Sequence, residues 1–486
     1  MLFDDPPLAN ACGRFPTQMQ LVADTRLEKH QPVLISLVGC LTDPESESGI
    51  TDDRKAEDAT APTPELEENP AVPQNLSPAL PVPIENVGPG DRYALHTSEF
   101  ARDPHQAYRH MRKTYGSLVP VWLAPGVEAT LVIGYQLAVD ILGDHEHFPA
   151  DPRTWERTVP ANCPILPMVG WRPNALRSTG ETHSFYRAAN QAALDGIDQL
   201  GLRDQVIQTA EPLINTFCGI GTADVISDYL LPLVFSLVNK MLGCPDDIGE
   251  QVRVAMAAMF ESTDTAHVNE ILGRALGQLI AMKRAQPGND ITTRLLTHRP
   301  PLSDEELVNQ VITLYGAGIE PTVNLIANTL LMMLTDDRFV CGAAGFGAPT
   351  IDAVNDILVY DPPMANYCLS FPPQPINKGG VWLPANKPVV ISMAACNNDP
   401  AVNNGEFLHA DWGLAFSTGK HACPISARIA VIQIACTAIG YLFDALPELT
   451  LARSKEQLVW RPGPFHRALA ELPVTFPKSP PLPIPA

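Results

Sequence analysis

The residues best suited to chemistry lie together near the C-terminal end, between Phe416 and Pro424. This stretch contains His421 and Cys423 and precedes an apolar helix predicted over 426–443. A cysteine just before a helix N-terminus receives backbone amides and the positive end of the helix dipole, which favour the thiolate. Cys423 is therefore predicted to be a soft metal ligand. A haem iron needs only one such thiolate, whose electron donation favours cleavage of the O–O bond.

Other chemistries fit this stretch less well. A closed zinc site needs more ligands than the nearby His421 supplies, whereas an inert buried cysteine is the plain alternative. Ser417 and Lys420 match the Ser-x-x-Lys pattern of penicillin-recognising hydrolases, but the chain has no Ser-Asp-Asn or Lys-Thr-Gly partner. A Walker-type phosphate loop fails because Gly413 lies one residue too far from Gly419 and because His421 replaces Ser or Thr.

Two predicted helices carry further candidate residues. The longer covers 303–334 and begins at Ser303, whose hydroxyl can cap the backbone amides while Glu306 reciprocates. Glycine and proline near its middle predict a kink or an opened turn at Glu320, which is either a catalytic carboxylate or a polar group that satisfies the kink. On the other helix, His183 and Arg187 are four residues apart and share one face. Alone, His183 would more often be a hydrogen-bonded structural histidine.

The composition excludes several classes of protein. The 486 residues are 45% hydrophobic and 18% charged, which excludes a wholly disordered or fibrous chain. A net charge of −21 argues against nucleic-acid binding, because phosphate contacts need a basic face. Ten widely spaced cysteines without a Cys-x-x-Cys pair are typical of a reducing cytoplasm. The longest apolar helical stretch, 427–443, falls short of the roughly 20 residues that span a membrane, so we expect a cytoplasmic protein without membrane contact.

The chain changes character near residue 90. Residues 1–90 carry 15 acidic and 5 basic residues, and prolines recur every few residues from Pro70 to Pro89. This composition predicts a solvated, disordered N-terminal extension, either a dispensable tail or an acidic interaction arm. Farther on, helical periods dominate, and the β-rich runs 118–123 and 129–133 predict a hairpin. We therefore expect a mainly α domain with small β-sheets over residues 91–486.

Four motifs in the right order resemble the cytochrome P450 superfamily over roughly residues 91–477. The family's haem-binding loop is resembled by Phe416-x-x-Gly419-x-His421-x-Cys423-Pro424, and the oxygen-binding turn of its long helix by Ala317-Gly318-Ile319-Glu320-Pro321-Thr322. Its propionate-binding pair is resembled by His183-x-x-x-Arg187. Its linking segments are resembled by Asp361-Pro362-Pro363 and Ala395-Cys396-Asn397-Asn398-Asp399-Pro400. The resemblance implies the cytochrome P450 fold, with haem b held between the long helix and the Cys423 loop. It is strongest to the soluble bacterial type, and within it to a subgroup that lacks the Glu-x-x-Arg motif.

The resemblance also implies a role for each motif residue. Glu320 takes the place of the family's acid and, with Thr322, would deliver protons during oxygen activation. The cofactor-binding residues would be Cys423 as axial ligand and metal-binding residue, Phe416 beside its sulfur, Gly419 in the same loop, Ala317 and Gly318 in the turn, and His421, His183 and Arg187 on the haem propionates.

Some positions depart from the family pattern. The expected Glu-x-x-Arg is Asp356-Ile357-Leu358-Val359, so the ion pair that ties this helix to the loop before the haem cysteine is lost unless another side chain substitutes. Residues 361–377 contain no Arg, so a customary propionate contact is missing. Pro321 stands where the family usually has Thr, and Thr322, rotated by about 100° on a helix, serves only if the opened turn re-aims it. Ser417 and Ile425 occupy positions where Gly is common.

The implied activity is that of a haem-thiolate monooxygenase, which inserts one atom of O2 into a small apolar organic substrate with electrons from a ferredoxin and a ferredoxin reductase. Lys420 and Arg428 lie where an acidic ferredoxin would dock, and residues 158–171 are the predicted substrate lid. The alternative is a haem-binding protein without monooxygenase turnover, acting as a sensor or interaction partner. The absent Glu-x-x-Arg and Pro321 motivate this alternative.

Overall fold

The computed structural model of the chain divides into two units, Met1–Pro81 and Val82–Ala486. It describes residues 20–22, 25–27, 84, 88–260, 265–339, 349–403 and 412–483. In the first unit, the described strands β1 (Gln20–Val22) and β2 (Thr25–Leu27) pair antiparallel. Almost all other residues of 1–90 lie outside the described ones, so the disorder predicted for this segment stays a prediction.

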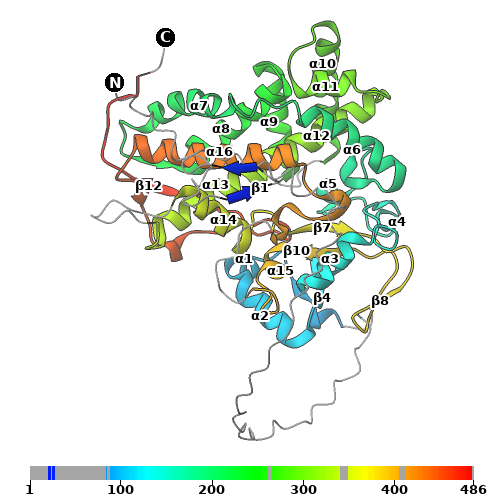
Figure 1. Cartoon of the computed structure of the whole chain (residues 1–486). Helices are drawn as coiled ribbons and strands as arrows, with labels where there is room; N and C mark the ends of the chain where they lie inside the picture. The colour runs from blue at the N-terminus through cyan, green and yellow to red at the C-terminus, as the bar shows by residue number, and fades with distance from the viewer. Residues whose placement is uncertain are drawn as a thin grey trace, which may run out of the picture. The chain divides into compact units, whose positions relative to one another are not determined.

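The second unit is mainly helical, as the sequence predicts (Figure 1). Its α-helices are α1 (Ser98–Arg102), α2 (Pro104–Tyr115), α3 (Tyr135–Gly143), α4 (Arg153–Glu156), α5 (Leu166–Val169), α6 (Gly180–Leu194), α7 (Leu202–Phe217), α8 (Leu231–Leu242), α9 (Asp246–Phe260), α10 (Thr265–Ala285), α11 (Ile291–Thr297), α12 (Asp304–Gly318), α13 (Glu320–Thr335), α14 (Thr350–Tyr360), α15 (Met393–Asn397) and α16 (Ile425–Ala445). The helices α7, α8, α13 and α16 lie together, whereas α1, α2, α3 and α15 lie with the largest sheet (Figure 1).

Small sheets complete this unit. Their strands are β3 (Tyr93–Ala94), β4 (Leu118–Ala124), β5 (Val127–Val132), β6 (Thr222–Asp224), β7 (Asn366–Ser370), β8 (Ile376–Lys378), β9 (Val381–Leu383), β10 (Val389–Ser392), β11 (Thr450–Leu451) and β12 (Pro473–Thr475). The largest sheet has the order β3-β4-β5-β10-β7, and β4 and β5 form the predicted antiparallel hairpin. Strand β10 pairs parallel to β5 and antiparallel to β7, which places the chain after α14 at one edge of this sheet.

The predicted long helix is interrupted at Ile319, between α12 and α13. Ser303 and Glu306 form the predicted capping box at its beginning. Pro321 lies in the first turn of α13 and has no N–H to donate to the carbonyl of Ala317, so the regular hydrogen-bond pattern cannot pass through this point. The kink that the sequence predicts is confirmed, and it opens the backbone beside Glu320.

Buried aromatic residues fix these helices against one another. The hydroxyl of Tyr229, before α8, donates to the carbonyl of Ala438 on α16 over 2.9 Å. The hydroxyl of Tyr315 on α12 donates to Oδ1 of Asn239 on α8 over 2.7 Å. Because both rings are fully buried and both hydroxyls have a partner, they contribute apolar packing without an unsatisfied polar group. One bond therefore joins the interrupted helix to α8, and the other joins the turn before α8 to α16.

Two helical stretches are long and apolar enough to cross a membrane by length and composition, Asp304–Thr335 and Ile425–Ala445. The sequence predicts a shorter apolar stretch, 427–443, but α16 has 21 residues because it begins directly after Pro424 and continues to Ala445. In this unit α16 packs against α7, α13 and α14. Core helices pass the same test, so the finding says little about a membrane location.

Candidate active site

A cavity of about 420 Å³ lies between the α12–α13 break and the loop that precedes α16. Its walls are mainly apolar and include a set of flexible methionines, Met168, Met241, Met256, Met364 and Met393. Pro167, Met168 and Gly170 of the predicted lid line it as well. A concave, mainly apolar cavity with few polar groups is typical of a site for a cofactor or a small molecule.

The structure brings the predicted site residues together around this cavity. All of them except one line the cavity. The lining residues are Glu320, Thr322, Cys423, His421, Phe416, His183, Arg187, Ala317 and Gly318. The exception is Gly419, which has a positive φ of 70°. A Cβ atom there would lie 2.5 Å from the carbonyl oxygen of Leu142, at the end of α3. Gly419 therefore shapes the loop where it passes α3, whereas the prediction places it at the cofactor.

Cys423 lies one residue before Pro424, the N-cap of α16. Its amide donates to the carbonyl of Phe416 over 2.9 Å, and its carbonyl accepts from Nε of Arg428 over 2.9 Å. Burial raises the pKa of the Cys423 thiol, although the charges of Arg428 and Arg187 lower it. A coordinated metal ion would oppose this effect of burial and favour the thiolate.

A second cysteine, Cys368 on β7, also lines the cavity, and the sequence analysis did not single it out. Burial raises the pKa of its thiol too, against the lowering by Ser417 and Arg177. The choice between the two cysteines as a ligand therefore depends on position. Cys423 stands in the loop whose backbone is fixed by α16, whereas Cys368 lies within a strand.

Ser417 stands where the resemblance places a glycine. Its backbone has φ 59° and ψ −178°, a combination that is favourable for glycine and strained for a residue with a side chain, by about 1–3 kcal/mol. The loop therefore keeps a glycine-type conformation although serine occupies it.

A group of imidazole and guanidinium side chains lines one side of the cavity. The rings of His183 and His421 lie 4.1 Å apart, and Nη1 of Arg187 donates to the carbonyl of Ala422 over 2.6 Å. Burial lowers the pKa of His183 to about 4 and that of His421 to about 3. Nε2 of His183 is buried and has no hydrogen-bond partner within the described part of the chain. These groups lack an anion, which is what a ligand with carboxylates would supply.

Two residues that contact this part of the structure, Arg177 in the cavity wall and His145 beside the cysteine loop, were missed by the sequence analysis. Arg177 is 2% exposed, and its Nη2 donates to the carbonyl of Met168 over 2.7 Å and to the hydroxyl of Tyr367 over 2.9 Å. Nε2 of His145 accepts from the amide of Lys420 over 3.2 Å, which ties the end of α3 to the cysteine loop. No local pattern marks either residue, since each reaches its partners only through the tertiary fold.

Glu320 is buried at the start of α13 and is not free. Nη1 of Arg461 lies 2.7 Å from its Oε1, and Nδ2 of Asn324 donates to the same oxygen over 3.2 Å. The side chain of Arg461 is 34% exposed, so it connects this carboxylate to solvent. Thr322 is buried and lines the cavity, and its Oγ1 has no hydrogen-bond partner among the described residues. The acid is therefore engaged in an ion pair, whereas the hydroxyl is available to a ligand or a water molecule.

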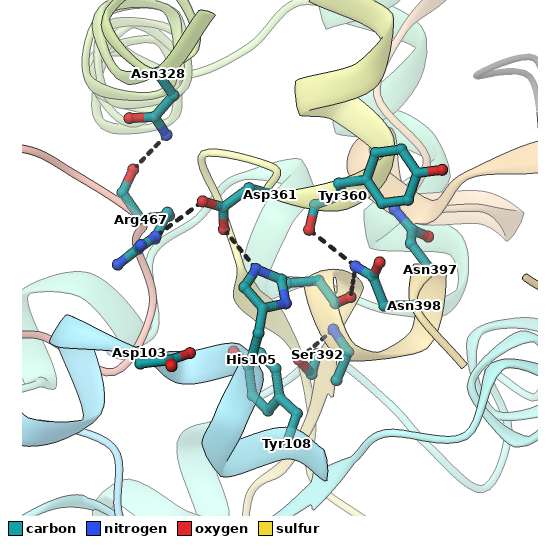
Figure 2. Close-up of polar contacts among 12 residues, drawn as sticks. Asp103, His105, Tyr108, Asn328, Tyr360, Asp361, Ser392, Asn397, Asn398 and Arg467 are labelled. Carbon is teal, nitrogen blue, oxygen red and sulfur yellow. Dashed lines mark hydrogen bonds and ion pairs between the residues drawn. The ribbon is translucent and has the colours of Figure 1, made fainter. Parts of the chain in front are cut away.

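A neutral side chain connects α14 to the cysteine loop, where the resemblance expects an ion pair. Nδ2 of the fully buried Asn397 donates to the carbonyl of Leu358 over 3.2 Å, and its Oδ1 accepts from the amide of Leu414 over 2.7 Å. Beside it, Asn398 donates to the carbonyl of Tyr360 over 2.8 Å (Figure 2). Asp356 pairs instead with Arg338, at 2.9 Å. The substitute that the sequence analysis left open is thus Asn397.

The end of α14 is held by a charged network centred on Asp361 (Figure 2). Its Oδ1 lies 3.2 Å from Nε2 of His105 on α2, and its Oδ2 accepts from Nε of Arg467 over 2.9 Å. The carbonyl of Arg467 accepts from Nδ2 of Asn328 on α13 over 2.9 Å. The network therefore joins α2, α13, α14 and the C-terminal segment through residues that do not line the cavity.

Asp361→Asn is expected to lower the free energy of unfolding at pH 7 by about 2 kcal/mol, the scale of a lost hydrogen bond to a charged group. Burial raises the pKa of Asp361, but Arg467 and His105 hold it below its ordinary value. A depressed folded-state pKa stabilises the protein above the unfolded pKa, and this contribution is lost as the pH falls below about 4. Urea unfolding at pH 7 and at acid pH measures both effects. Glu250→Gln, which breaks an exposed pair with Arg253, is the control; an equal loss in both variants would contradict the prediction.

Comparison with known proteins identifies the family. No protein-family model matches the chain. Cytochrome P450 107B1 of Saccharopolyspora erythraea is 26% identical over 390 residues, which cover 77% of this chain and 95% of that protein. The cytochrome P450 monooxygenase PikC of Streptomyces venezuelae is 28% identical over 395 residues, 78% of this chain and 92% of PikC. The solved structure of P450BioI, in complex with an acyl carrier protein ligated to hexadec-9Z-enoic acid, has a TM-score of 0.66 and 24% identity, covering 78% of this chain and all of that one.

The chain belongs to the cytochrome P450 superfamily, and its relatives are the bacterial members. The predicted fold and cofactor, haem b with an axial cysteine thiolate, are confirmed at the level of the family, as is the activity of a haem-dependent monooxygenase. The residues present fit this group: a cysteine lines the cavity at a helix start, its walls are apolar, and the buried Nε2 of His183 lies among cations without an anion.

Proposed function

We propose that the chain is an active haem-thiolate monooxygenase that inserts one atom of O2 into a small apolar organic substrate, with electrons from a ferredoxin and a ferredoxin reductase. The observation that carries this proposal is the apolar cavity, which is lined by Cys423 and by Glu320 and Thr322 of the opened turn. Both halves of the site that oxygen activation needs, a ligand and a proton source, therefore face the same space.

Within this proposal, Cys423 is the axial ligand and Phe416 packs beside its sulfur, held in place by the guanidinium of Arg428 at 5.5 Å from the ring centre. When bound, the haem supplies oxygen activation and electron transfer. His183, His421 and Arg187 hold its propionates, which would give the unpartnered Nε2 of His183 an acceptor. Binding of two carboxylates would also favour the protonated imidazoles, reversing the pKa depression that burial causes.

Proton delivery is assigned to Glu320 and Thr322. Protons would enter from solvent along the partly exposed Arg461 and its water shell, reach the carboxylate of Glu320, and pass to the cavity at the free hydroxyl of Thr322. Pro321 lies between these two residues, where the helix turn is opened. Thr322 lines the cavity, which supports the expectation that the opened turn directs its side chain toward the site.

The electron donor would dock near Lys420, which is exposed beside the cysteine loop. Arg428, the other cation predicted there, turns inward to the carbonyl of Cys423 and the ring of Phe416, so its support for docking is weaker. We place the protein in the cytoplasm, in keeping with its ten cysteines, of which those in the described residues are free.

The test is the visible spectrum of the purified, dithionite-reduced protein with carbon monoxide, followed by turnover with ferredoxin, ferredoxin reductase and NADPH. We expect a red-shifted Soret band and, with an apolar substrate, product formed in proportion to the electrons consumed. A normal spectrum with peroxide as the sole product under every condition tried would favour the sensor or interaction partner instead. No thiolate spectrum at all would overturn the proposal.

A further inference from the structure

The charges around the cavity do not balance. Of the described residues that line it, Glu320 is the one with a carboxylate, and Arg461 already pairs with it from outside the lining. Three arginines line the same cavity, Arg172, Arg177 and Arg187. None of them lies within ion-pair distance of a carboxylate in the described part of the chain. A desolvated guanidinium without an anion is unfavourable, so ligands are expected to bring negative charge.

Two of these arginines lie on the propionate side. Arg187 reaches the carbonyl of Ala422 in the cysteine loop. Arg177 reaches the hydroxyl of Tyr367, within the segment 361–377 that contains no arginine of its own. Arg177 thus provides from the loop before α6 the charge that this segment lacks. Two guanidinium groups match the two propionates of one haem.

One positive charge is then left. Arg172 lines the cavity and reaches toward the beginning of α10. Its Nη2 donates to Oδ1 of Asn269 on α10 over 2.9 Å, a neutral partner that leaves most of its donors unused. Burial lowers the pKa of Arg172, and the nearby charge of Arg177 lowers it further. Both effects would be offset by a carboxylate at this place.

We propose that the cavity takes an apolar molecule that carries one carboxylate, and that Arg172 binds this carboxylate at the end of the cavity next to α10. This inference rests on the proposed function, because it is the two propionates of a bound haem that would pair with Arg177 and Arg187 and leave Arg172 without an anion. The apolar body of the molecule lies along the methionine-rich wall. Its charged end is fixed by a bidentate, charge-assisted pair, so the molecule lies in the cavity in one orientation. Arg172 therefore selects for acids and sets which end of the substrate reacts.

The experiment compares straight-chain carboxylates of eight to sixteen carbons with their methyl esters, by isothermal titration calorimetry on the haem-loaded full chain. We expect the best acid to bind at least about tenfold more tightly than its ester, the effect of one hydrogen-bonded pair with a charge. Arg172→Gln removes the charge but keeps a donor for Asn269, and it should remove this preference while leaving the affinity for the ester unchanged. Arg172→Lys should retain part of the preference, and Arg203→Gln, an exposed arginine on α7, all of it.

The two proposals fail in different ways. Haem content and the carbon monoxide spectrum are recorded on every sample, so a defect in haem binding is seen before any ligand is added. Arg177→Gln should accelerate haem transfer to apomyoglobin without changing the preference for acids. Arg172→Gln should remove the preference for acids without changing the rate of haem transfer. If no acid of the series binds to a normally loaded protein, if esters bind as tightly as acids, or if Arg172→Gln weakens both equally, the assignment of Arg172 is wrong.

Discussion

Cys423→Ala is expected to abolish the red-shifted Soret band of the reduced carbon monoxide complex and to reduce turnover to below ~0.1%, at least about 4 kcal/mol in activation free energy. The reason is that sulfur donation to iron promotes O–O cleavage, and no other side chain of the cysteine loop can replace it. Haem would still be held in part through its propionates, so the variant should bind haem with a spectrum typical of another ligand. Absorption spectra and product formation measure both effects.

The matched control is Cys368→Ala, because Cys368 is the other described cysteine that lines the cavity. It should keep the thiolate spectrum and most of the turnover. The reverse outcome, in which loss of Cys368 removes the band and loss of Cys423 does not, would move the axial ligand to β7 and overturn the assignment of the loop.

Glu320→Gln is expected to lower coupled turnover by about a hundredfold, the lower end of the effect of a positioned acid or base. Glutamine retains a hydrogen-bond acceptor for Asn324 and Arg461 but cannot release a proton, so oxygen reduction should divert to peroxide. The carbon monoxide spectrum and the affinity for substrate should not change. Product, peroxide and NADPH consumption, measured together, give the coupling, and a changed solvent isotope effect would locate the defect in proton transfer.

Glu181→Gln, an exposed carboxylate in the first turn of α6, serves as the control for a lost acidic charge and should keep normal coupling. If Glu320→Gln were also fully coupled, Glu320 would be the polar group that satisfies the helix kink, as the plainer interpretation of the sequence holds. Its bonds to Arg461 and Asn324 would then have a structural role only.

Local patterns were sufficient for most of the elements that surround the site. The capping box at Ser303 and the break beside Pro321 depend on backbone chemistry within a few residues, and both are confirmed. The hairpin of β4 and β5 follows from two β-rich runs around a turn. Where contacts between distant segments decide, local patterns are not sufficient: strand β6 forms because residues 222–224 pair with β12 from the C-terminal end.

The site was predictable only where a motif marks it. Cys423, His421 and His183 belong to recurring patterns, and the structure brings them to one cavity. Arg461 and Arg177 belong to no pattern, because each acts on a residue more than a hundred positions away. Asn397 belongs to a recurring segment, but nothing in that segment marks its role, because its amide connects α14 to the cysteine loop only when the two meet in space.

The contact through Asn397 makes the support of the cysteine loop independent of the salt around the protein. An amide carries no net charge and does not titrate in the physiological range, so neither added salt nor a change of pH weakens its two hydrogen bonds directly. An ion pair in the same place would require two charges to lose their hydration together as the chain folds. The segment that presents Cys423 is therefore anchored to α14 by a contact whose strength is the same in dilute and in concentrated salt.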